Sequence, residues 1–258
     1  MRSLVSIIIP AWNEQARLPA TLQALAQFVE SQAANPITLE AIVVDNASTD
    51  GTHRIASEFA QAHPYLRVIR EQRRGKGAAV RSGMFEGQGQ YLIICDADLA
   101  MPMTELPKFL PPCIDNFGVA IGSREAAGSM RYHEPLYRHY MGRIFTLVTK
   151  LVALQGFEDT QCGYKCFERE VALDLFSCQT MDGWAFDVEV LYIARRRGYR
   201  IVEVPIQWYY RPNSRISPLA DSLRMVREVW RVRQNGRAGL YERPRSGNYR
   251  SANPTASR

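Results

Sequence analysis

The chain has 258 residues, of which 46% are hydrophobic and 22% are charged. This composition is typical of a globular protein and excludes a mostly disordered chain or a fibrous repeat. We find no signal-peptide pattern and no run of about 18 apolar residues, so no transmembrane helix is expected. The five cysteines are not spaced as a disulfide framework or a zinc site, which favours reduced thiols in a cytoplasm.

The net charge of +6 is concentrated at the C-terminal end. Residues 211–258 contain 11 arginines, no lysine and 3 acidic residues, whereas residues 1–210 have a net charge of −2. A basic end favours a phosphate-rich partner, such as an anionic lipid surface or a phosphorylated substrate. No aromatic and basic recognition motif accompanies it, so we expect no nucleic acid partner. Residues 236–258 lack periodicity and are predicted to form a flexible basic tail.

The first half of the chain alternates between short apolar runs and helical patterns. Strands are predicted at 4–9, 41–44, 66–69, 91–95 and 118–121, and helices at 13–29, 50–62, 77–85 and 105–114. This alternation predicts a mostly parallel sheet covered by helices, an α/β fold in which ligands bind at the carboxyl ends of the strands. Polar clusters fall at four of these ends: 13–14, 45–46, 96–98 and 123–124.

The second half is predicted to contain more helix. Helices are expected at 131–155, 168–176, 186–196 and 217–234, and strands at 164–167 and 201–208. The first of these helices is apolar on most sides, which is typical of a helix that is buried or touches lipid. The last one is amphipathic. Its apolar side is predicted to hold Leu219, Leu223, Val226 and Trp230, and its basic side Arg224, Arg227 and Arg231.

Asp96 and Asp98 carry the strongest chemical signal in the sequence. They lie two residues apart at the end of a predicted buried strand, where carboxylates can hold a hard divalent cation such as Mg²⁺ or Mn²⁺. Such an ion keeps water ligands and completes its shell with substrate phosphates. An Asp-x-Asp tripeptide also occurs in ordinary turns, but its place at a strand end favours a metal site.

Two further segments point to an anionic ligand. Asp45 follows a predicted strand and can accept hydrogen bonds from a ribose or a base; a capping turn is the alternative. Residues 75–77, Gly-Lys-Gly, precede a helix, where backbone N–H groups and positive charge can approach an anion; a flexible basic loop is the alternative. The chain has neither a G-x-G-x-x-G nor a Walker A sequence, which argues against NAD enzymes and P-loop ATPases.

Several segments together resemble the family 2 inverting glycosyltransferases of GT-A fold. They are 10–14 (Pro-Ala-Trp-Asn-Glu), 43–52, 75–84 and 96–98 (Asp-Ala-Asp). Three later segments, at 122–124, 159–165 and 184–189, resemble the polyprenyl-phosphate glycosyltransferases, in particular those that transfer glucose to dolichyl phosphate. The resemblance implies a Rossmann-like single domain over 1–235, with a nucleotide-binding half (1–125) and an acceptor-binding half (126–235).

The resemblance also implies roles for individual residues. Those expected to line or approach the nucleotide pocket are Pro10, Asn13, Glu14, Asp45 and Lys76. Asp96 would contact both nucleotide and metal, and Asp98 would be the main metal ligand.

On the acceptor side, Arg124 and Lys165 would face the phosphates of donor or acceptor, and Gln161 would sit near the sugar. Asp187 and Glu189 lie on one predicted helix but on different faces, so at most one of them points into the site.

The implied reaction is an inverting, metal-dependent transfer of a hexose, glucose from UDP-glucose, to a polyprenyl or dolichyl phosphate. The mannosyl members of the group often carry Gln two residues after the second metal-binding Asp, and Ala100 stands there in this chain. Glucosyl members usually begin with a membrane helix, and this sequence starts at its first strand. We therefore expect a cytoplasmic enzyme that attaches peripherally to the inner face of the membrane, through the helices at 131–154 and 217–234.

Three alternatives stay open at this point. The donor can be GDP-mannose or another sugar nucleotide. The acceptor can be a soluble or glycolipid hydroxyl, in which case Asp187 or Glu189 is a candidate general base. A non-catalytic sugar-nucleotide-binding protein is the third alternative, and the intact pair Asp96 and Asp98 argues against it.

Overall fold

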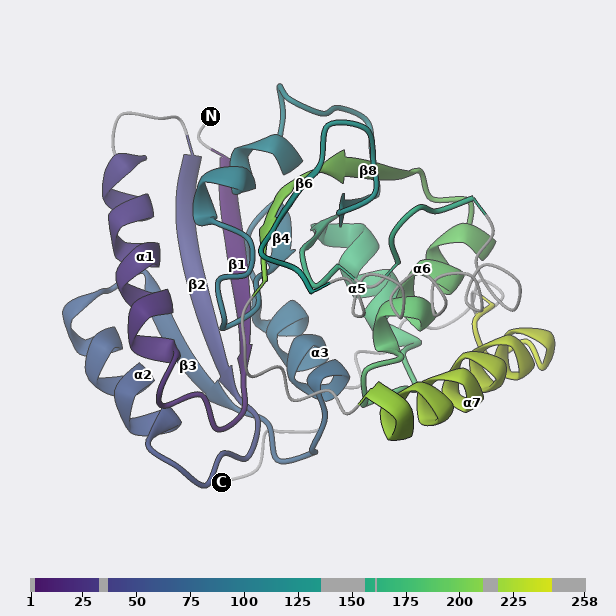
Figure 1. Cartoon of the computed structure of the whole chain (residues 1–258), viewed down its shortest axis with the longest axis horizontal. Helices are drawn as coiled ribbons and strands as arrows, with labels where there is room; N and C mark the ends of the chain where they lie inside the picture. Colours follow the sequence, from purple (N-terminus) through teal and green to yellow (C-terminus); the bar gives the residue numbers. More distant parts are fainter. Residues whose placement is uncertain (1–2, 33–36, 136–155, 161, 211–217, 243–258) are drawn as a thin grey trace.

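In a computed structural model of the chain, the residues described are 3–32, 37–135, 156–160, 162–210 and 218–242. Their main feature is a seven-stranded sheet of order β3-β2-β1-β4-β7-β5-β8, flanked by helices (Figure 1). Its strands are β1 (Ser3–Ala11), β2 (Ile37–Asp45), β3 (Leu66–Arg70), β4 (Tyr91–Ile94), β5 (Val119–Ser123), β7 (Lys165–Glu168) and β8 (Ile201–Pro205). The predicted α/β fold is confirmed.

Each face of the sheet has its own hydrophobic core, because side chains alternate along a strand. Ile7 and Ile9 pack with helices α1 (Leu18–Ser31) and α2 (Thr52–Ala62) and the 3₁₀ helix η1 (Met103–Phe109). Ile8, between them, points into the opposite core. That second core is closed by α3 (Lys76–Glu86), α5 (Arg169–Ser177), α6 (Phe186–Arg196) and α7 (Pro218–Arg237).

Strand β7 joins the two halves of the chain into one sheet. It runs antiparallel between β4 and β5, so Cys166 lies opposite both Ile93 and Ala120. All other neighbours in the sheet are parallel. The expected division at residue 125 is therefore not a division of the fold, and as a division of function it stays a prediction.

Several predicted elements differ from those observed. Helix α1 begins at Leu18 rather than near residue 13, because Asn13 has a φ of 52° and Pro19 favours the first helical turn. The segment predicted as a helix at 105–114 is a short 3₁₀ helix with Pro107 inside it.

The strand predicted at 201–208 is divided after Pro205. Its second part, β9 (Gln207–Tyr209), leaves the main sheet and pairs with β6 (Met130–Tyr132). Arg131 and Tyr132 are therefore in a strand rather than at the start of a helix, and 136–155 lies outside the described residues.

Helix α7 packs against α6 through residues outside the apolar side that the sequence predicts. Val229 and Val232 are buried, whereas Val226 and Trp230 are 38% and 49% exposed. The predicted tail also needs correction over residues 236–242, because Tyr241 is buried and donates a hydrogen bond to Glu189 Oε1 (2.7 Å). Within the part of the chain that is described, no helix is long and apolar enough to cross a membrane.

Candidate active site

The carboxyl ends of β1, β2 and β4 bring the predicted polar clusters together. These strands are parallel, and Ala11 of β1 lies opposite Asp45 of β2. Asn46 N donates to Ala11 O (2.8 Å), and this hydrogen bond holds the end of β1 beside the end of β2. The sequence-based expectation of one polar edge is confirmed for these segments, and this edge is where α/β proteins bind ligands.

The loop after β1 is tied to the loop after β2 through polar side chains. Asn13 Oδ1 accepts a hydrogen bond from Thr49 N (2.8 Å), and Asn13 N donates to Ser48 Oγ (3.0 Å). Glu14 N donates to Thr52 Oγ1 (2.7 Å), at the start of α2. Pro10, the next-to-last residue of β1, lies opposite Val44. These residues give the edge a fixed backbone, and nucleotide contact stays a prediction for them.

Asp45, the last residue of β2, is a buried carboxylate at this edge. Its carboxylate accepts a hydrogen bond from Ser48 N (3.2 Å), and Arg70 Nε lies 3.4 Å and His53 Nδ1 3.6 Å from Oδ2. A buried carboxylate beside two cationic or polar groups is suited to a fixed hydrogen-bond partner such as a ribose hydroxyl. Sequence reasoning did not foresee Arg70 and His53, because both come from elements that approach Asp45 only in the folded chain.

The Asp96 carboxylate is held from two sides. Lys76 Nζ lies 2.6 Å from Asp96 Oδ1, and the backbone of Gly163 lies so close that a Cβ atom there would collide with Oδ2. Burial by itself would lower the pKa of Lys76, but the carboxylates of Asp96 and Asp187 outweigh burial and raise it. Lys76 is therefore a permanent cation beside Asp96.

Asp98 shares this site with Asp96. Its Oδ1 accepts a hydrogen bond from Ala100 N (3.0 Å), and burial together with the charge of Asp96 raises the pKa of the Asp98 carboxyl. Arg17, which sequence reasoning missed, also approaches the pair: burial opposes its charge, but Glu14, Asp98 and Asp96 raise its pKa overall. Two carboxylates that repel each other in a partly buried site are suited to an added cation.

A divalent ion fits this pair only with ligands from elsewhere. Among the described residues no group of three His, Cys, Asp or Glu side chains is arranged to hold a metal. Asp96 and Asp98 would therefore supply two oxygen ligands, and water and substrate phosphate the others, as is usual for Mg²⁺. Glu14 is no candidate ligand, because Arg17 holds both its oxygens at 2.6 Å.

The two glycines beside Lys76 allow close packing of the backbone. They do not form the open anion-binding loop that the sequence suggests. Gly75 has a φ of 132°, and a Cβ atom there would collide with Asp182 O. At Gly77 a Cβ atom would lie 2.5 Å from Met181 O. Gly75 N already donates to Asn46 Oδ1 (2.8 Å). The glycines therefore let residues 181–183 lie against the start of α3, which carries Lys76 into the site.

Lys165 is engaged within the chain, and phosphate contact stays a prediction for it. Its side chain is buried, and Nζ bonds to Asp187 Oδ1 and to Cys162 O, both at 2.5 Å. Asp187 is also buried and takes this lysine as its ionic partner. The physical reason is that β7 lies inside the sheet, where a charged side chain must find an internal partner.

Glu189 points to a different environment from Asp187, as the helical spacing predicts. Its carboxylate accepts hydrogen bonds from Thr180 N (3.0 Å) and Met181 N (2.9 Å), and from the hydroxyl of Tyr241. The side chain is buried. Glu189 thus fixes the loop before α6 and is not placed to take a proton from an acceptor.

Arg124, at the end of β5, is engaged by Asp159. Its Nε and Nη2 lie 2.6 Å and 3.0 Å from the two carboxylate oxygens, and its guanidinium stacks over Trp208. Burial opposes the charge, but Asp159 raises the pKa of Arg124. Phosphate contact through its remaining N–H groups stays a prediction. Gln161, predicted near the sugar, lies outside the described residues.

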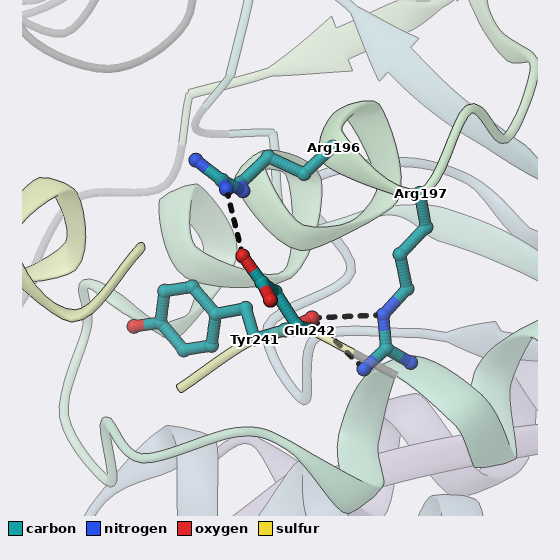
Figure 2. A pocket seen from close by; sticks show the side chains of 4 residues that line it. All are labelled: Arg196, Arg197, Tyr241 and Glu242. Atoms are coloured by element: carbon teal, nitrogen blue, oxygen red, sulfur yellow. Dashed lines mark hydrogen bonds and ion pairs between the residues drawn. The ribbon is translucent and has the colours of Figure 1, made fainter. Parts of the chain in front are cut away.

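A separate surface pocket lies at the other end of α6 from Asp187. Figure 2 shows the side chains that line it, which are Arg196, Arg197, Tyr241 and Glu242. Arg197 donates to Tyr241 O from Nε (3.1 Å) and Nη2 (3.0 Å), and Arg196 pairs with Glu242 (3.7 Å). Its charges are thus paired within the chain, and none of the strand-end residues lines it.

The mostly parallel sheet, with an Asp-Ala-Asp motif at the end of β4, defines a glycosyltransferase fold of the GT-A type. The chain belongs to glycosyl transferase family 2, whose sequence model matches residues 6–176. The predicted family is confirmed.

The relatives found include several with the same name. A dolichyl-phosphate beta-glucosyltransferase of Drosophila melanogaster is 34% identical over 244 residues, which cover 88% of this chain and 74% of that protein. The protein of the same name from Homo sapiens is 33% identical over 89% of this chain and 74% of its own length. That of Dictyostelium discoideum is 29% identical over 92% of this chain and 76% of its own length.

Solved structures share the fold at lower sequence identity. The Mycobacterium tuberculosis glucosyl-3-phosphoglycerate synthase in complex with UDP superposes with a TM-score of 0.62, at 20% identity, over 95% of this chain and 82% of that one. A complex of the same enzyme with Mn²⁺, UDP-glucose and phosphoglyceric acid has the same TM-score at 19% identity and the same coverage. These structures support the fold.

The buried pair of Lys165 and Asp187 predicts a specific pattern of stability. Lys165→Met should lower the free energy of unfolding by about 3–5 kcal/mol, because it leaves the Asp187 carboxylate buried without a partner. The double variant Lys165→Met/Asp187→Leu should regain a large part of that loss. Urea unfolding followed by circular dichroism measures both, and equal stability of the single variant and the wild type would contradict the assignment.

Proposed function

We propose that this chain is an inverting hexosyltransferase that transfers glucose from UDP-glucose to a polyprenyl phosphate such as dolichyl phosphate, with Mg²⁺ or Mn²⁺ as cofactor. The observation that carries the proposal is the similarity to dolichyl-phosphate beta-glucosyltransferases, which spans about nine-tenths of the chain and so includes both halves. The carboxylate pair beside Lys76 supplies the chemistry.

This reaction requires stabilisation of charge more than covalent help. A phosphate acceptor is already anionic at neutral pH, so the charge to be stabilised is that on the departing nucleoside diphosphate. A divalent ion bound by Asp96 and Asp98 would act as a Lewis acid and a template at this position. Lys76 and Arg17 add fixed positive charge near the same carboxylates. Direct displacement at an α-linked donor gives a β-linked product.

The surroundings of the two candidate bases favour a phosphate over a hydroxyl acceptor. A hydroxyl acceptor needs a general base within hydrogen-bond reach of its proton. Asp187 is buried in its pair with Lys165, and Glu189 is buried under hydrogen bonds from the loop before α6. Neither carboxylate is accessible to an incoming hydroxyl group. A phosphate acceptor needs no general base, because it is already anionic.

Asp98→Asn should abolish transfer and metal-dependent donor binding while the fold stays intact. The substitution keeps the shape of the side chain and removes the charge that holds the ion. Glucose transfer to a short polyprenyl phosphate, with Mn²⁺ titrated, measures the effect. Asp115→Asn is the matched control, because Asp115 is exposed and precedes the amino end of β5, whereas the site lies at the carboxyl ends of the strands. Transfer that survives with unchanged metal dependence would contradict the assignment.

The protein should bind UDP more tightly than GDP, and only with Mg²⁺ or Mn²⁺ present. The expectation rests on the glucosyl relatives and on Ala100, which offers no ligand atom from its side chain where mannosyl members carry Gln. Isothermal titration calorimetry with both nucleotides, with and without the metal, is the measurement. A preference for GDP would favour a mannosyl donor instead.

Peripheral attachment to a membrane is part of the proposal, since the acceptor is a membrane lipid. On α7, the exposed side chains of Val226 and Trp230 lie beside those of Arg227 and Arg231. An apolar strip flanked by arginines is typical of a helix that lies in the membrane interface. The helix expected at 131–154 falls largely outside the described residues.

Vesicle flotation tests this surface. Binding to anionic vesicles should weaken in high salt and weaken again on Arg224/Arg227/Arg231→Glu, because each cation near an anionic surface contributes about 1 kcal/mol, roughly a hundredfold for three. The control is Arg54/Arg195/Arg200→Glu, which changes the net charge equally at exposed positions outside α7. No binding at low salt, with or without polyprenyl phosphate, would contradict it and favour a soluble acceptor.

A further inference from the structure

Trp184 is an exposed aromatic side chain next to the carboxylate site. It is 41% exposed, and Lys76 Nζ lies 5.3 Å from the centroid of its ring. The same Nζ is 2.6 Å from Asp96 Oδ1, so Lys76 lies between the indole and the carboxylate that we propose binds the metal. Leaving a large apolar ring open to water at a polar site has a cost that a substrate contact would offset.

The backbone that carries Trp184 is fixed more firmly than an exposed loop requires. Glu189 accepts hydrogen bonds from the N–H groups of Thr180 and Met181, and Ala78 N donates to Asp182 O (3.2 Å). Gly75 and Gly77 have no side chains that would keep residues 181–183 away from α3. The indole is therefore presented from a rigid support, which is what a contact surface for a ligand needs.

We propose that the exposed surface of the Trp184 indole is the platform for the hexose ring of the donor. This inference rests on the proposed function and adds a residue that positions the sugar. In a nucleoside diphosphate sugar, the hexose is bonded directly to the diphosphate, which we propose binds at Asp96 and Asp98 through the metal. The C–H face of the sugar is thus the first apolar surface beyond the diphosphate. A lipid tail lies farther away, because the acceptor phosphate separates it from the sugar.

The chemistry of the two surfaces is complementary. One face of a pyranose presents C–H groups, and an indole presents a broad, electron-rich face that packs against them. Lys76 near the ring keeps positive charge close to the junction of sugar and diphosphate. The indole supplies contact area and orientation, while selectivity among hexoses requires hydrogen bonds from other groups.

The decisive experiment compares a donor with its sugar-free product. Calorimetric affinities for UDP-glucose and for UDP, both with Mn²⁺, are measured for the wild type, Trp184→Ala and Trp184→Phe. Trp184→Ala should weaken UDP-glucose binding about fivefold or more and leave UDP binding within about twofold, because only the sugar loses its contact. Trp184→Phe should retain most of the affinity, because it keeps an aromatic face.

Phe85→Ala is the matched control, because Phe85 is 44% exposed near the end of α3 and has no place in the proposed site. It should leave both affinities unchanged. Steady-state kinetics of Trp184→Ala should show a raised KM for UDP-glucose with an unchanged KM for the polyprenyl phosphate.

Three results would overturn the inference. They are an equal loss of UDP and UDP-glucose affinity in Trp184→Ala, unchanged affinity for both, and a raised KM for the lipid acceptor alone, which would assign the ring to the acceptor. A wild-type protein that binds no UDP-glucose would overturn the proposed function as well, so the two failures are distinguishable.

Discussion

The ion pair between Lys76 and Asp96 is the constraint on which the rest of the site depends. To bring the ammonium within 2.6 Å of the carboxylate, the start of α3 must approach the end of β4. That approach leaves no room for side chains at Gly75, Gly77 and Gly163, each of which faces another part of the backbone or the carboxylate itself. These three glycines therefore leave the space in which the charged groups meet.

A second, buried set of charges links the second half of the chain to the candidate site. Lys165 enters from β7, in the middle of the sheet, and its partner Asp187 stands in the first turn of α6. The negative charge of Asp187 also raises the pKa of Lys76. A residue of the second half of the chain therefore acts electrostatically on a cation of the first half. Breaking the buried pair should thus disturb both stability and the electrostatics of the strand-end site.

Local patterns in the sequence predict much of this structure. The runs around residues 4–9, 41–44 and 91–95 are strands, and the polar residues after them meet at one edge, because parallel strands end on the same side. The insertion of β7 between β4 and β5 was not predictable, since strand order is a non-local property. For the same reason, the sequence does not predict that Lys165 pairs with Asp187 inside the fold.

Helix α7 shows the same limit and connects the surface to the site. Periodicity identifies an amphipathic helix, but apolar residues occur on two of its sides, and only packing on α6 decides that Val229 is buried while Trp230 is exposed. The segment that ends α7 is tied to the loop before α6: Asn235 Nδ2 donates to Thr180 Oγ1 (3.0 Å), and Tyr241 to Glu189. Because that loop leads to Trp184, the helix with the exposed basic and apolar side also supports the aromatic ring beside Lys76 and Asp96.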